Sequence, residues 1–158
     1  MASTDANSAP AGGAEGALGA DMALEVVTIP VSDVDRAKRF YQSLGWRLDI
    51  DFSPAAGVRT VQFTPPHSPC SIQFGMGVTT AEPGSQGNVF LVVNDIDAAR
   101  ADLVSRGIDV NAVQDMRPPG SESAGRSYFA RATFSDPDGN SWLLQEITTR
   151  LPGREWGD

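Results

Sequence analysis

Apolar and polar positions follow one pattern twice along this chain of 158 residues. An apolar run reaches Val-Ser-Asp-Val-Asp at positions 31–35, and Val-Asn-Asp-Ile-Asp repeats it 62 positions later, at 93–97. The same offset places Gly45 on Gly107 without a gap. Matches that stay in register over such a distance predict a tandem duplication.

Each copy predicts a strand followed by an amphipathic helix. Asp33 and Asp95 stand where a side chain accepts hydrogen bonds from the free N–H groups of a first helical turn, and the two glycines stand where a helix ends. We therefore expect helices over residues 33–44 and 95–106. The apolar residues between these signals share one helical face; in the first copy they are Val34, Ala37, Phe40, Tyr41 and Leu44.

Elsewhere the chain alternates between apolar and polar residues, which is typical of half-buried strands. This alternation predicts an α+β fold of two tandem βαβββ modules. The expected strands are 24–31, 46–52, 58–64 and 70–75 in module 1 (about 22–80), and 88–93, 108–113, 127–134 and 141–148 in module 2 (about 86–150).

Three stretches lack this pattern. Residues 1–21 consist largely of Ala, Gly and Ser, which predicts a disordered segment, and they lack the charged and apolar regions of a signal peptide. Residues 151–158 are expected to form a C-terminal tail. The polar loop 114–126 is long enough to act as a lid over a binding site, and a disordered surface insertion is the alternative.

Composition narrows the classes of function. A net charge of −8 argues against nucleic-acid binding, which needs clustered Lys and Arg, and no apolar run is long enough to span a bilayer. Cys70 is the single cysteine, so an intramolecular disulfide is impossible and a reducing cytoplasm fits. A hydrophobic content of 41% suffices for the core of one domain over residues 22–150.

Several of these features together resemble a known family. A strand that ends in Val-Ser-Asp, a following Asp-Arg-Ala helix with Phe40 and Tyr41, the second copy of this unit, and the turn Asp-Pro-Asp-Gly-Asn at 136–140 are similar to the vicinal oxygen chelate superfamily. That superfamily includes the glyoxalase, bleomycin-resistance and extradiol-dioxygenase proteins. The resemblance covers roughly residues 24–149. It implies that the modules form a curled mixed sheet around a cavity, with the helices on the outside.

The resemblance also implies where metal ligands would stand. Family enzymes that use a metal place ligands, typically His and Glu, on the first and last strand of each module. These positions match Val26, Gln73, Asn88 and Leu143. Valine and leucine have no lone pair to donate, and two neutral amides rarely hold a catalytic metal alone. We therefore expect no metal and no cofactor.

Neighbours of these positions define a candidate pocket, because side chains two apart along a strand share a face. Arg131 is a candidate partner for an anionic group of a ligand, or an exposed residue at an edge. A different interpretation is that Gln73 and Asn88 satisfy one another in a closed core. The expected pocket has apolar walls and a few polar groups; its residues are Val26, Thr28, Gln73, Asn88, Phe90, Arg131, Leu143 and Gln145, with Val92 and Ile147 on the same faces.

Other reactive side chains carry weaker signals, and no catalytic residue is assigned. His67 stands between prolines and serine in a turn, where an exposed side chain is expected. Asp136 and Asp138 resemble a catalytic carboxylate pair but are better explained as turn formers.

Two classes of function fit these observations. The first is a protein of the drug-resistance type that binds or sequesters an organic small molecule, which requires a pocket and no metal. The second is an isomerase, lyase or cyclase that acts on an oxygenated organic substrate without a metal, or with a metal held elsewhere. An interaction module with a filled cavity is a third alternative. The expected partners are a small-molecule ligand and a second copy of the chain in a homodimer.

Overall fold

A computed structural model describes residues 20–155 of the chain. The segment predicted to be disordered over residues 1–21 lies outside the described residues except for its last two positions. The last three residues of the predicted tail lie outside them as well.

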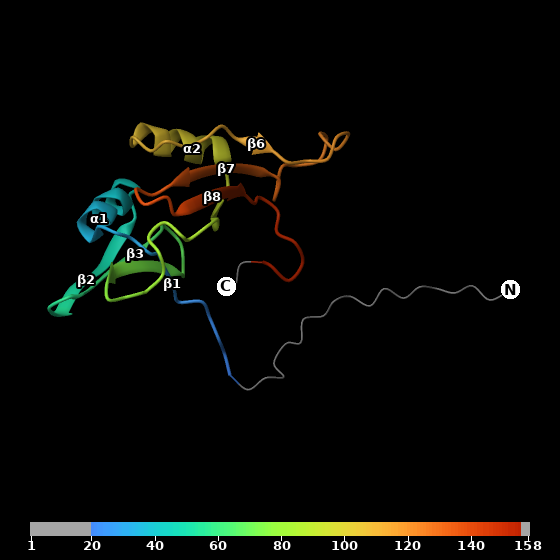
Figure 1. The fold of residues 1–158 in the computed structure, drawn as a ribbon. Coiled ribbons are helices and arrows are strands. Elements are labelled where there is room, and N and C mark those ends of the chain that lie inside the picture. The colour runs from blue at the N-terminus through green and yellow to red at the C-terminus, as the bar shows by residue number, and fades with distance from the viewer. Residues whose placement is uncertain (1–19, 156–158) are drawn as a thin grey trace.

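The first copy of the repeat forms a βαβββ module with one four-stranded sheet, which we call sheet 1. Its elements are β1 (Val26–Thr28), α1 (Val34–Ser43), β2 (Arg47–Ala55), β3 (Val58–Thr64) and β4 (Ser71–Met76). The strand order is β1-β4-β3-β2, with β1 parallel to β4 and the other neighbours antiparallel (Figure 1).

The second copy repeats this topology in a separate sheet, which we call sheet 2. Its elements are β5 (Val89–Val93), α2 (Ile96–Ser105), β6 (Gln114–Asp115), β7 (Ala130–Ser135) and β8 (Ser141–Glu146). The order β5-β8-β7-β6 matches that of sheet 1 strand for strand, with β5 parallel to β8. The α+β class and the two tandem modules are thus confirmed.

Both helices begin and end where the repeat predicts. The carboxylate of Asp33 accepts a hydrogen bond of 3.0 Å from the backbone N–H of Arg36, and Asp95 does the same for Ala98. Gly45 and Gly107 follow the helices with φ of 79° and 85°, a conformation that glycine adopts without a steric penalty.

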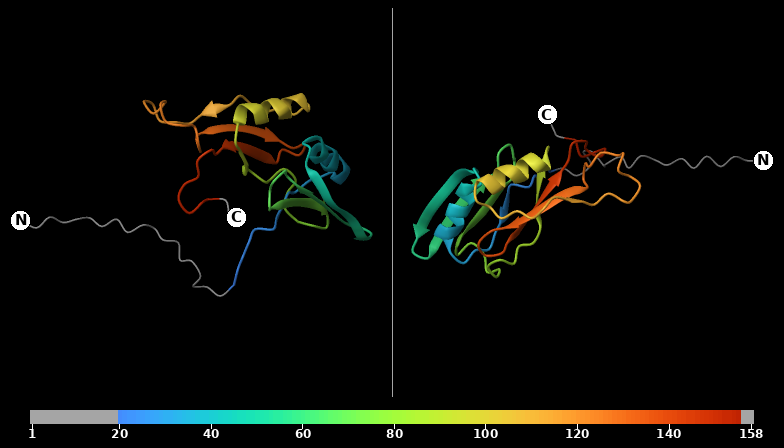
Figure 2. Two further views of the ribbon diagram at one scale, coloured as in Figure 1. Left: turned by 180° about the vertical axis from the view of Figure 1, so that it is seen from behind. Right: turned by 90° about the horizontal axis from the view of Figure 1, so that it is seen from above.

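One hydrophobic core joins the two modules. α1 packs against β3 and β4, and α2 lies over β7 and β8 (Figures 1 and 2). Tyr41 of α1 also reaches across to module 2, where its ring lies 6.0 Å from that of Trp142, and Phe40 lies 6.4 Å from Phe134. Buried residues from both modules therefore form a single cluster.

The predicted strand over residues 108–113 does not form. Ile108 and Val110 are buried, so the alternation of apolar and polar residues correctly predicts which side chains of this stretch enter the core. However, the backbone N–H of Thr133 donates to the side-chain oxygen of Asn111 at 2.6 Å. In a regular pair of strands this N–H would donate to a backbone carbonyl instead. The backbone N–H of Asn111 still donates to the carbonyl of Thr133 at 3.0 Å, but in this region only the two residues of β6 are paired in register with β7.

The strand predicted over residues 127–134 begins later, at Ala130. Tyr128 has a φ of 71°, which is incompatible with an extended strand and turns the chain before β7. The preceding loop folds around Arg117, which donates hydrogen bonds to Asp115 and to the carbonyls of Glu122 and Ala124, and it projects beyond the sheets (Figure 1).

Each module contributes one mixed sheet, and the two sheets do not close on one another. Within residues 20–155, no strand of sheet 1 pairs with a strand of sheet 2, so β1 and β5 are both edge strands. As a consequence, one face of each sheet carries exposed apolar side chains, which include Ile50, Phe52, Phe90 and Val92.

Candidate ligand-binding site

The eight predicted pocket residues divide between the two sheets. Val26, Thr28 and Gln73 lie on one face of sheet 1, since β1 pairs in register with β4 and places Thr28 opposite Gln73. The side-chain amide of Gln73 donates to the hydroxyl of Thr28 at 3.0 Å. Gln73 is therefore already partnered within its own sheet.

Asn88 does not pair with Gln73, so the interpretation of a mutual amide pair is wrong. Its backbone N–H donates to the hydroxyl of Ser141 at 2.7 Å, and the same hydroxyl donates to its side-chain oxygen at 3.4 Å. With a φ of 49°, Asn88 precedes β5 and ties the beginning of that strand to β8.

The remaining predicted residues share one face of sheet 2. Strand pairing places Phe90 opposite Leu143 and Val92 opposite Gln145, and Gln145 in turn lies opposite Arg131. Leu143 and Gln145 are nearly enclosed, whereas Phe90 remains 49% exposed. An apolar rim with an amide at its centre is the usual make-up of a pocket for an organic ligand.

A hollow of about 330 Å³ lies on this face, which we call the sheet 2 pocket. Apolar side chains form most of its wall, and an amide, a phenol and a guanidinium supply the polar groups. Its lining residues are Phe90, Val92, Tyr128, Gln145, Ile147, Leu151 and Arg154.

Part of this wall was missed at the level of sequence. The sequence predicts Tyr128 in a strand, but a turn brings its carbonyl within 2.8 Å of the Gln145 amide, which donates to it. Its hydroxyl accepts the backbone N–H of Leu151 at 3.2 Å and thereby holds the C-terminal segment beside the pocket. No periodic pattern in the sequence predicts that Leu151 and Arg154 line the pocket, because their positions depend on these tertiary contacts.

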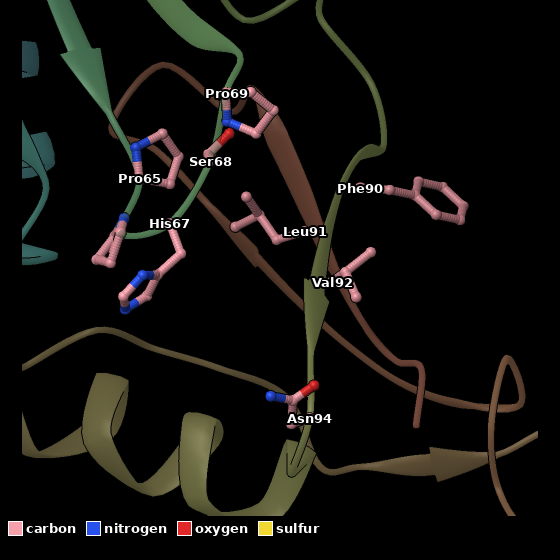
Figure 3. A pocket seen from close by; sticks show the side chains of 9 residues that line it. Pro65, His67, Ser68, Pro69, Phe90, Leu91, Val92 and Asn94 are labelled. Atoms are coloured by element: carbon pink, nitrogen blue, oxygen red, sulfur yellow. The ribbon is translucent and has the colours of Figure 1, made fainter. Parts of the chain in front are cut away.

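A second, larger hollow of about 490 Å³ adjoins the first, with Phe90 and Val92 lining both. It lies between β5 and the proline-rich turn Pro65–Pro69, and Leu91 points from the strand toward that turn (Figure 3). His67 lines it with a φ of 62° and an exposed side chain, as expected from its turn. A ligand larger than the sheet 2 pocket could therefore extend along β5.

Arg131 supplies a positive charge beside Phe90 and Gln145, two residues that line the sheet 2 pocket. Its guanidinium carbon lies 5.8 Å from the centroid of the Phe90 ring, so the side chain spans β8, which lies between their strands. Its Nε–H is buried and has no hydrogen-bond partner among the described residues. The arginine therefore stacks on an aromatic ring without a carboxylate beside it.

Acid–base candidates lie away from this pocket. On β2, Arg47 and then Thr64 lower the pKa of Asp49, so this carboxylate stays ionised and is a poor proton donor. Burial raises the pKa of the Cys70 thiol, which disfavours the nucleophilic thiolate. Asp136 is buried in a structural network with Tyr41 and Asn140, which confirms its role as a turn residue.

The four positions that the resemblance matches to family metal ligands offer few donor atoms. Val26 and Leu143 have no donor atom, and the amides of Gln73 and Asn88 belong to different sheets. Within the described part of the chain, no group of three or more His, Cys, Asp or Glu residues is arranged to hold an ion.

No described helix is long and apolar enough to cross a membrane.

Comparisons with known proteins agree with this architecture. The model of the Glyoxalase/Bleomycin resistance protein/Dioxygenase superfamily matches residues 23–144. TnmS3, an antibiotic binding protein from Streptomyces sp. CB03234, is 30% identical, with a TM-score of 0.66 over 82% of this chain and 99% of that chain.

Two further solved structures are similar. A glyoxalase/bleomycin resistance protein from the same Streptomyces strain is 31% identical, with a TM-score of 0.61 over 78% of this chain and 99% of that chain. A superfamily member from Sphaerobacter thermophilus DSM 20745 is 27% identical, with a TM-score of 0.63 over 80% and 98%. No curated protein matches the sequence significantly.

Proposed function

Because the chain belongs to the glyoxalase/bleomycin resistance protein/dioxygenase superfamily, we propose that it binds and sequesters an organic small molecule in the sheet 2 pocket. The observation that carries this proposal is the lining of the pocket: apolar and aromatic side chains surround a few polar groups, and Gln145 is held in place by Tyr128. Affinity would come from the buried apolar area and orientation from the polar groups. The similarity to TnmS3, an antibiotic binding protein, supports this class of function.

The chemistry of the lining favours binding over a reaction. None of the described residues that line the sheet 2 pocket is a His, Cys, Asp or Glu, the side chains that most often transfer protons. The phenol oxygen of Tyr128 accepts the backbone N–H of Leu151 and thus has a structural role. An isomerase, lyase or cyclase is therefore the less supported alternative.

A matched pair of variants tests this location. Val92→Glu places a carboxylate in the apolar wall, whereas Val104→Glu places one on the outer face of α2 at similar exposure, 38% against 46%. After a thermal-shift screen of aromatic antibiotics and hydroxyacids has found a ligand, Val92→Glu should weaken its binding by about tenfold or more, because the carboxylate must be desolvated. Val104→Glu should leave the dissociation constant unchanged. Equal affinities in both variants would place the site elsewhere.

The proposed site needs no metal, since two of the four family ligand positions are Val26 and Leu143. Protein purified without a chelator should carry far less than one equivalent of Zn, Ni, Fe, Mn or Co. EDTA should change neither the melting temperature nor the dissociation constant of a ligand. Stoichiometric, tightly bound metal would contradict this part of the proposal.

The proposed assembly is a homodimer in which a second copy covers the open face of sheet 1 and leaves the sheet 2 pocket accessible. Phe52 of sheet 1 is 61% exposed, and Ile50 lies on the same face of the sheet. On the neighbouring strand β3, Thr60 lies opposite Phe52 and Gln62 lies opposite Ile50. Apolar surface of this kind marks association sites, and twofold dimers are the commonest oligomers. Light scattering should give twice the mass of the chain, and Phe52→Asp should shift it toward the monomer. A wild-type monomer at high concentration would rule out this assembly.

A reducing cytoplasm is the proposed location, on the basis of the lone Cys70.

A further inference from the structure

Arg131 differs from the arginines that the fold uses as ion-pair partners. Arg36, Arg59 and Arg126, for example, each contact a carboxylate within 3.2 Å. Arg131 has no such partner among the described residues, although the net charge of the chain is −8 and carboxylates are abundant. Its position beside the sheet 2 pocket is therefore not explained by an ion pair.

The immediate surroundings of Arg131 are poor in compensating charge. Its Nε–H is buried without an acceptor, and its guanidinium lies over the Phe90 ring. Opposite it in the sheet stands Gln145, whose side-chain N–H group already donates to Tyr128. Arg131 is half-buried, and burying even part of a guanidinium without an anion is costly; stacking on one ring compensates only part of that cost.

The adjoining pocket has the same sign of charge. None of its described lining residues is acidic, and Arg154 adds a second guanidinium to its wall. Arg154 in the wall, Arg131 beside the wall residues Phe90 and Gln145, and the lack of a carboxylate in the lining together favour a negatively charged occupant. Phe90, which receives the guanidinium, is still half exposed and so offers ring surface to a planar group.

We infer that the sheet 2 pocket selects an anionic aromatic ligand, whose carboxylate or similar planar oxyanion pairs with Arg131 while its ring packs on Phe90. This inference rests on the proposed function and adds the chemical class of the ligand. Arginine suits this role because its planar fork of N–H donors matches a carboxylate in two parallel hydrogen bonds. The ring of the ligand would replace water on the apolar wall formed by Phe90, Val92 and Ile147.

Two probes of equal size separate the charge from the ring. Naphthalene-2-carboxylate and naphthalene-2-carboxamide present the same ring, and only the first carries a negative charge at pH 7. Titration calorimetry of the full chain should show the carboxylate binding at least about tenfold more tightly, the difference expected when a hydrogen bond to a charged group is gained. The preference should decrease as salt is raised, because the pocket is open to solvent.

Variants assign the preference to Arg131. Arg131→Gln should reduce it to within about twofold while leaving carboxamide binding unchanged, and Arg131→Lys should keep part of it, since lysine supplies charge without the planar fork. Arg39→Gln is the control: it removes the same charge from an exposed side chain of α1 that has no ion pair among the described residues, and it should not alter the preference. Thermal melts of all three variants establish that each is folded.

The outcomes separate this inference from the proposed function. Equal binding of both probes to the wild type would overturn the inference and leave a pocket for aromatic ligands. If Arg131→Gln still binds the carboxylate more tightly than the carboxamide, a group other than Arg131 recognises the negative charge. If neither probe binds at millimolar concentration, both the inference and the proposed pocket for aromatic ligands are overturned.

Discussion

At the scale of single residues, Tyr41 connects the two modules. Its hydroxyl donates to the carboxylate of Asp136 at 2.8 Å and accepts the indole N–H of Trp142 at 3.2 Å. Burial, and then the negative charge of Asp136, raise the pKa of Tyr41 far above its usual range, so the phenol stays protonated and remains a donor.

Tyr41→Phe should lower the free energy of unfolding by about 1–3 kcal/mol, the cost of leaving a buried donor unsatisfied. Asp136 keeps the amide of Asn140 and two backbone N–H groups as donors, so the unpaired group is the indole N–H of Trp142. Urea denaturation measures the difference. Tyr128→Phe is the control, because its hydroxyl accepts only an exposed hydrogen bond and should cost about 0.5 kcal/mol or less. A loss of that small size in Tyr41→Phe would contradict the assigned role.

Residue roles were predictable from the sequence where they depend on neighbours along the chain. The caps Asp33 and Asp95 act on N–H groups three positions away, so spacing alone identifies them. Tyr128 contacts Gln145 and Leu151 because it lies in a turn with positive φ. The residues around a tyrosine in the sequence do not predict such a turn. The candidate site was therefore predicted in its strand residues and missed in its turn and its C-terminal wall.

At the scale of elements, charged side chains fix α1 to β2 and β3 of sheet 1. Asp51 of β2 accepts hydrogen bonds from Arg59 of β3 and Lys38 of α1, and Arg59 also pairs with Asp35 at the beginning of the helix. Arg59, and after it Lys38, hold the pKa of Asp51 well below its usual range. The folded state therefore favours the ionised carboxylate.

This arrangement predicts how stability depends on pH. A carboxylate with a lowered pKa in the folded state contributes stability above the ordinary pKa of about 4, and this stability is lost as the pH falls toward the folded value. Asp51→Asn should thus be less stable than the wild type at pH 7, and the difference should shrink between about pH 4 and pH 2. Urea midpoints at pH 7, 5 and 3 measure it. Asp102→Asn, in an exposed pair with Arg106, should differ little from the wild type at any pH. A constant difference for Asp51→Asn across this range would refute the coupling.

Elements were predicted well where periodicity and capping agree, and poorly where the chain leaves the sheet. Both helices and seven of the eight expected strands form, although most of these strands begin or end at other residues than expected. In the stretch 108–113, apolar residues alternate because Ile108 and Val110 enter the core, yet Asn111 replaces the ladder with a side-chain hydrogen bond. Alternation predicts which side chains are buried, whereas the partner of each backbone group depends on residues far along the chain.

At the scale of the whole molecule, the duplication gives two similar modules that are not independent. Trp142 packs against Tyr41 and Trp46, and Phe134 packs against Phe40, so the core of each module contains side chains of the other. The amide of Asn140 donates to the carbonyl of Pro30 at 2.8 Å in the same region. The sequence predicted both modules, but the separation of their sheets depends on this packing and could not be read from either copy alone.

A chain that ends at Gly84 should therefore fail to form a stable monomer. It would expose the rings of Phe40, Tyr41 and Trp46, and a fragment of about 60 ordered residues buries too small a fraction of its surface to offset this loss. Far-UV circular dichroism should show an unfolded chain, or light scattering should show that the fragment pairs with itself. Adding residues 85–158 as a second polypeptide should restore helical signal and cooperative unfolding, because it returns Phe134, Asn140 and Trp142 to their partners. A soluble monomeric fragment with cooperative unfolding would show that the shared core is dispensable, and the modules would then have to be regarded as independent domains.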